Sequence, residues 1–185
     1  MTLFITAQRE VSQLVMIDMQ EKLANAMDKS EMSRVSKNCE ILLQAARLLT
    51  IPTIVTEQYP KGLGHTTKYL VQHLQHTTCI EKTSFSCCEE STFNQKLTND
   101  RRQLILVGME SHICILQTAL ALRKMGKEVF VVEDATISRD PNNKSNALKR
   151  LAHSGIIISN TESVLFEWLG NAEGENFKQI SKLIR

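Results

Sequence analysis

The sequence lacks the features that mark several large classes of protein. No apolar run approaches the roughly 20 residues of a membrane-spanning helix, so we expect no membrane partner. No Gly-x-Gly-x-x-Gly motif joins a strand to a helix, so a dinucleotide-binding loop is not indicated. No repeat, low-complexity tract or linker interrupts the 185 residues. This length suits a single domain covering residues 1–185.

An excess of charge of either sign is also missing. The 22 Lys and Arg residues are scattered and nearly balanced by 20 Asp and Glu, giving a formal net charge of +2. Nucleic acid is therefore not an expected partner. The five cysteines are odd in number and form no Cys-x-x-Cys motif. This pattern favours free thiols and a cytoplasmic protein.

Short apolar runs alternate with segments of helical periodicity. Unbroken Val, Ile and Leu runs are typical of strands covered on both faces, as in parallel sheets. Helices between such strands predict right-handed crossovers. We therefore predict an α/β fold, a three-layer α/β/α sandwich with a central, mostly parallel, Rossmann-like sheet of about six strands. The expected strands are residues 14–17, 53–56, 78–81, 103–108, 128–132 and 155–159.

Ligands of open parallel sheets bind beyond the carboxyl ends of the strands. The residues that follow each apolar run are therefore the candidates for a site. Each has an ordinary alternative, because aspartates cap helices, lysines are mostly solvated and free cysteines often fill cores. These candidates are Asp18, Glu57, Gln58, Lys82, residues 110–114, Glu133 and Asp134.

Cys114 has local features of a nucleophile. Ser111 can cap a helix that ends before Gly126, which places Cys114 in the first turn. The helix dipole and free N–H groups stabilise a thiolate there, so we expect a lowered thiol pKa. Asp18 could act as base and Lys82 could stabilise the charges, while N–H groups at the helix start could bind an oxyanion. A small core side chain is the alternative for Cys114.

Several segments together resemble the isochorismatase-like cysteine hydrolase family, in particular its isochorismatase-domain-containing proteins. The resemblance implies Asp18 as general base, Lys82 as electrostatic support and Cys114 as nucleophile. The implied substrate is a small amide or related carbonyl compound. The resemblance also implies a cis peptide between Met109 and Glu110, and an oxyanion hole formed by the backbone N–H groups of Glu110 and Cys114. The matching segments are residues 15–20, 81–85, 108–114 with 117–119, 133–135 and 161–169.

One departure from the family bears on metal binding. Members that bind a metal carry an Asp-x-His pattern after the second strand, whereas residues 56–64 read TEQYPKGLG. We therefore expect no metal and no cofactor. His73 and His76 share a helical face but have no evident carboxylate partner, so metal binding there is disfavoured. The candidates for the substrate pocket are Gln20, Gln58, Tyr59, Phe85 and Met109.

The helix after Cys114 is apolar on two faces, which is more than one sheet contact requires. A homo-oligomer that buries the second face would account for this pattern, and so would neighbouring helices of the same chain. The alternative function is an oligomeric binding or scaffold member of the family with little or no turnover.

Overall fold

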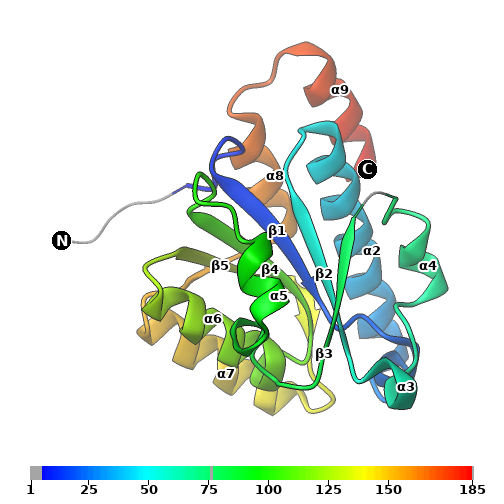
Figure 1. Ribbon diagram of the computed structural model, residues 1–185. Helices are drawn as coiled ribbons and strands as arrows, with labels where there is room; N and C mark the ends of the chain where they lie inside the picture. Colours follow the sequence, from blue (N-terminus) through cyan, green and yellow to red (C-terminus); the bar gives the residue numbers. More distant parts are fainter. Residues whose placement is uncertain (1–5, 76, 185) are drawn as a thin grey trace.

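A central parallel sheet organises the computed structural model, which describes residues 6–75 and 77–184 (Figure 1). Every strand pairs in parallel with its neighbours, in the order β3-β2-β1-β4-β5-β6. The strands are β1 Ser12–Ile17, β2 Thr53–Gln58, β3 Thr78–Lys82, β4 Gln103–Met109, β5 Glu128–Ile137 and β6 Ile157–Ser159.

Helices cover both faces of the sheet and complete the predicted three-layer α/β/α sandwich (Figure 1). One core cluster packs α2 and α8 against the sheet, and the other packs α5, α6 and α7 against the opposite face. Among the described residues, no helix has the length and apolar character needed to span a bilayer. The α-helices are α1 Glu21–Ala24, α2 Lys29–Leu48, α3 Pro60–Leu63, α4 Lys68–Val71, α5 Ser91–Lys96, α6 Leu116–Lys124, α7 Pro141–His153, α8 Thr161–Leu169 and α9 Gly174–Leu183.

The prediction of a strand at residues 128–132 ended too early, because β5 continues to Ile137. Its pairing with β4 shifts register, with Leu106 opposite Val131 and Gly108 opposite Thr136. This irregularity lets β5 accommodate extra residues and continue beyond Val132. Glu133 and Asp134 therefore lie within the strand, and placing them after its end was wrong.

The strand order places the candidate residues around one point of the sheet. The chain leaves β1 toward β2 and β3 on one side, and later adds β4, β5 and β6 on the other. The loops after β1 and β4 diverge at this switch point, which is where open α/β sheets form ligand crevices. Asp18 follows β1 and Glu110 follows β4, so both lie at this crevice.

Gly108 permits the close approach of β4 to β1. It adopts φ +114°, and a Cβ atom there would lie 2.0 Å from the carbonyl oxygen of Ile17. We expect Gly108→Ala to lower the free energy of unfolding by about 2–3 kcal/mol, since strain and overlap act together. Gly126 is the matched control, because it has φ +82° and a Cβ atom at that position would have nothing within 4 Å.

Gly126→Ala should lower the free energy of unfolding by only about 1 kcal/mol, the cost of a left-handed backbone at an L-residue. Urea unfolding of both variants measures the difference. Equal losses at the two positions would contradict the steric account of Gly108.

Candidate active site

Asp18 occupies the turn directly after β1 and is completely buried. Its backbone has φ +54°, and its N–H donates to the Thr56 carbonyl at 3.0 Å. The Thr56 hydroxyl donates to Asp18 Oδ1 at 2.7 Å. The neighbouring strand β2 therefore fixes both the backbone and the carboxylate of Asp18.

Lys82, the last residue of β3, extends past the end of β2 to reach Asp18. Its Nζ donates to Asp18 Oδ2 at 2.7 Å and to Gln58 Oε1 at 2.5 Å, and lies 3.6 Å from Cys114 Sγ. Burial by itself lowers the pKa of Lys82, but Asp18 and the Cys114 and Cys87 thiols outweigh it. The pKa of Lys82 therefore lies above its ordinary value, and the amine carries a proton.

Cys114 lies in a π-helical turn, Ser111–Ile115, that leads into α6. The prediction that Ser111 caps this helix was wrong, because Glu110 occupies the cap position and provides no side-chain cap hydrogen bond. The Ser111 hydroxyl is buried and has no partner among the described residues. Because the π-helical turn comes first, α6 itself begins only at Leu116. Turns of this kind are frequent at functional sites.

The pKa of the Cys114 thiol is raised, not lowered. Burial is the main cause and the Asp18 carboxylate the second, while Lys82 acts in the opposite direction. The expectation from the helix dipole was wrong, because only 6% of Cys114 is exposed and burial disfavours the thiolate. At neutral pH the resting site therefore holds a thiol next to an ammonium–carboxylate pair.

The sequence reasoning missed two neighbours of this group. Cys87 is buried, its Sγ lies 4.0 Å from the Thr56 hydroxyl, and its N–H donates to Thr118 Oγ1 at 3.0 Å. Burial, reinforced by Asp18, raises the pKa of Cys87 to about 12. The hydroxyl of Thr56, inside an otherwise ordinary strand, was a weak signal, and nothing in the spacing of Cys87 indicated its position.

Two of the predicted pocket residues form a hydrogen-bonded frame. Gln20 Oε1 accepts from the Gln58 N–H at 2.7 Å, and its Nε2 donates to the carbonyls of Gln58 and Gly64 at 2.9 and 2.6 Å. Gln58 in turn accepts from Lys82. Gln20 and Gln58 thus link the segment after β1 to the end of β2 and orient the amine of Lys82.

The other three predicted pocket residues differ in exposure. Tyr59 and Phe85 are 55% and 54% exposed, whereas Met109 is buried in the core on the α2 side of the sheet. A hollow of about 370 Å³ has both Tyr59 and Lys82 in its lining. Tyr59 therefore borders an open space beside the lysine, while Met109 contributes packing.

Polar contacts connect the loops after β4 and β5. The Met109–Glu110 peptide is cis, as the family resemblance implied. Glu110 Oε2 accepts from the N–H and Nε of Arg139 at 2.9 and 3.2 Å. His112 Nδ1 lies 3.0 Å from the Ser138 hydroxyl. These contacts hold the segment that precedes Cys114 against the end of β5.

Metal ligands do not gather at this site. In the described part of the chain, no group of three or more His, Cys, Asp or Glu side chains is arranged to hold a metal ion. His73 Nε2 lies 3.2 Å from Glu40 Oε1, a carboxylate neighbour that the sequence reasoning did not identify. His76 lies outside the described residues.

Known proteins share both the sequence and the fold. The isochorismatase domain family matches residues 12–163. Isochorismatase domain-containing protein 2 from Danio rerio is 43% identical over 94% of this chain and 86% of the relative. A structure described as MAR1 ribonuclease from Caenorhabditis elegans is 37% identical, with a TM-score of 0.92, covering 97% of this chain and 92% of that one.

The octameric hydrolase YcaC from Escherichia coli, described as of unknown specificity, has a TM-score of 0.90. It is 18% identical and covers 98% of this chain and 91% of its own. At this identity the likeness concerns the fold alone.

Proposed function

Because this chain belongs to the isochorismatase family of hydrolases, we propose that it hydrolyses a small amide or related carbonyl compound through a thioester on Cys114. The observation that carries the proposal is the buried contact of three reactive groups. Lys82 Nζ lies 2.7 Å from the carboxylate of Asp18 and 3.6 Å from the sulfur of Cys114. A buried acid–base pair beside a thiol is the arrangement that nucleophilic catalysis requires.

In the first step, Asp18 takes the proton of the Cys114 thiol as Sγ forms a bond to the carbonyl carbon. The raised pKa of the thiol favours a transfer that accompanies the attack. The oxyanion is proposed to accept hydrogen bonds from the backbone N–H groups of Glu110 and Cys114. The carbon–nitrogen bond then breaks, and Asp18 returns the proton to the departing amine.

In the second step, water attacks the thioester carbonyl and gives a proton to Asp18. The carbon–sulfur bond breaks, the acid product leaves, and the Cys114 thiolate recovers the proton. Lys82 remains protonated throughout, since its pKa lies above the ordinary value. Its role is to hold the charge of Asp18 and of the developing thiolate, with Gln58 fixing its position.

The test is interception of the thioester. The protein is screened for ammonia release from a panel of small primary amides, and the active amides are then hydrolysed in the presence of hydroxylamine. We expect hydroxamate to replace part of the acid product, because hydroxylamine competes with water for a thioester. Intact mass of acid-quenched samples should show an acyl group on the peptide that contains Cys114.

Hydrolysis without hydroxamate or acyl adduct would overturn the thioester route. Binding of a panel amide with no turnover, in wild type and Cys114→Ala alike, would instead favour the binding or scaffold alternative.

A ribonuclease is the second candidate, because the Caenorhabditis elegans protein described as one is 37% identical. Digestion of a labelled single-stranded RNA by wild type, lost in Asp18→Asn and Cys114→Ala, would support this candidate. Digestion that persists in both variants would show that these residues do not carry it.

We also propose a homo-oligomer. The apolar faces of α6 do not require one, because α6 packs on the sheet and on α7 of the same chain. The proposal is prompted by a protein of the same fold, the YcaC hydrolase of Escherichia coli, which is described as octameric. Light scattering coupled to size-exclusion chromatography measures the assembly directly.

A further inference from the structure

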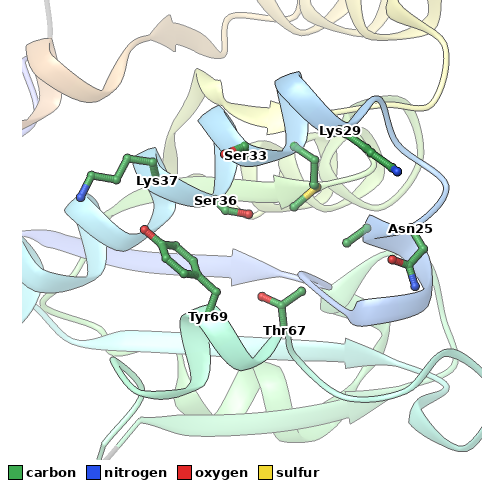
Figure 2. A pocket seen from close by; sticks show the side chains of 9 residues that line it. Asn25, Lys29, Ser33, Ser36, Lys37, Thr67 and Tyr69 are labelled. Atoms are coloured by element: carbon green, nitrogen blue, oxygen red, sulfur yellow. The ribbon is translucent and has the colours of Figure 1, made fainter.

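A second cavity lies away from the residues proposed for catalysis. It has a volume of about 620 Å³ and opens between the first turns of α2, the end of α1 and the start of α4 (Figure 2). None of Asp18, Lys82 and Cys114 belongs to its lining. The volume falls within the range of small-molecule pockets, about 300–1,000 Å³.

The lining of this cavity carries positive charge. Lys29 and Lys37 flank it at opposite ends of the α2 segment, as Figure 2 shows, and no Asp or Glu is part of the lining. The Glu40 carboxylate lies outside the lining, 3.3 Å from Lys37 Nζ, and the Tyr69 hydroxyl donates to it. An anionic group would therefore meet the Lys29 ammonium group with no acid in the lining, whereas at Lys37 it would compete with Glu40.

Hydroxyl groups and apolar surface complete the cavity. The Thr67 side chain is part of the lining, but its hydroxyl oxygen has almost no accessible surface, so a ligand in the cavity does not reach it. Ser33 supplies an exposed hydroxyl. Ser36 supplies a further hydroxyl, and Met32 and the ring of Tyr69 supply apolar contacts.

We propose that this cavity is a binding site for a small organic carboxylate with an apolar body. The carboxylate interacts with Lys29 or Lys37, a polar substituent pairs with the hydroxyl of Ser33 or Ser36, and the apolar body packs on Met32 and Tyr69. This site is independent of the proposed hydrolase chemistry. A backbone hydrogen bond links this site to the segment after β1, since the Thr67 N–H donates to the carbonyl of Met19 at 2.9 Å.

The experiment observes the Met32 methyl group by NMR. The protein is labelled with ¹³C at the methionine methyl groups, and Met32→Leu identifies the Met32 signal among the seven methionines. The probe is 4-hydroxybenzoate, and its neutral counterpart is 4-hydroxybenzyl alcohol. We expect the acid to shift the Met32 signal in a saturable way, in wild type and in Cys114→Ala, and the alcohol to bind at least about tenfold more weakly.

The double variant Lys29→Gln/Lys37→Gln should weaken binding about tenfold, since each exposed ion pair contributes modestly. Lys149→Gln/Lys178→Gln removes the same charge from exposed positions outside the lining and should bind like wild type. No saturable shift, equal binding of acid and alcohol, or equal loss in the two double variants would overturn the proposal. A Met32 signal that depends on protein concentration and not on the acid would also overturn it, and would assign the cavity to a contact between copies.

Discussion

Asp18→Asn should lower amide hydrolysis about thousandfold, and Cys114→Ala should lower it at least as much. An amide side chain cannot accept the thiol proton, and the loss of a general base typically costs about 10²–10⁴ in rate. The asparagine keeps nearly the same volume, so its Oδ1 can still accept from Thr56. The variant also leaves the Lys82 ammonium group buried without its counter-charge, so its free energy of unfolding should fall, and circular dichroism and urea unfolding must show that the assayed protein is folded.

The same substitution should make Cys114 easier to alkylate. The negative charge of Asp18 raises the pKa of the thiol, so its removal lowers that pKa and increases the thiolate fraction at a given pH. The pH profile of iodoacetamide labelling at Cys114, read by mass spectrometry of the tryptic peptide, should move to lower pH. Asp100→Asn, an exposed acidic position, is the control and should leave both rates unchanged.

Opposite changes in turnover and alkylation distinguish a base from a merely structural carboxylate. Damage to the fold would expose every thiol, including Cys39, which is completely buried in the core. Hydrolysis at wild-type rate in Asp18→Asn, or a labelling profile moved to higher pH, would contradict the assignment of Asp18.

Lys82→Met should lower the free energy of unfolding by about 3–5 kcal/mol, because it leaves the Asp18 carboxylate buried without its counter-charge. Lys82 Nζ also donates to Gln58 Oε1 and to the Ser84 carbonyl, at 2.5 and 3.2 Å. The melting temperature of a chain of this size should fall by roughly 10 °C. Urea unfolding at pH 7 measures the loss, and Lys68→Met at an exposed position is the control.

The double variant Asp18→Asn/Lys82→Met separates charge from packing. Because it removes both buried charges, we expect it to be more stable than Lys82→Met alone, by about 2 kcal/mol or more. A double variant as unstable as the sum of the two single variants would show that the ion pair contributes little.

The pH dependence of stability follows from the direction of the Lys82 shift. The pKa of Lys82 is higher in the folded state than in the unfolded state. The stabilisation that Lys82 provides is therefore complete below the unfolded pKa of about 10.4, and it is lost only as the pH rises through the folded pKa. Wild type should accordingly lose the stabilisation that Lys82 provides only in the alkaline range.

Strand ends were the most informative feature of the sequence. Parallel strands align their carboxyl ends, so the side chains that follow them were expected to meet. They do so in the structure, although Asp18 and Lys82 are 64 residues apart in the sequence, and Lys82 and Cys114 are 32 residues apart. Their catalytic roles stay predictions. The strands were likewise predictable, because strands buried on both faces of a parallel sheet read as unbroken apolar runs.

Features that depend on three-dimensional burial were not predictable. The thiol pKa is set by the surroundings of Cys114, which local helix geometry does not reveal. The extension of β5 depends on an irregular pairing with β4, and the position of Cys87 beside Thr56 depends on how the segment after β3 folds back. Such long-range contacts leave no local pattern.

The central position of β1 has a consequence for synthesis on the ribosome. β1 pairs with β2 on one side, but its other edge stays unpaired until β4 is made, whose residues 103–108 stand opposite residues 12–17. A nascent chain that ends before residue 103 can pair β1, β2 and β3 while one edge of its most buried strand stays open. Open strand edges are templates for pairing with other chains. Translation pauses in this interval should therefore favour aggregation, and a chaperone that binds extended apolar segments should be most effective there.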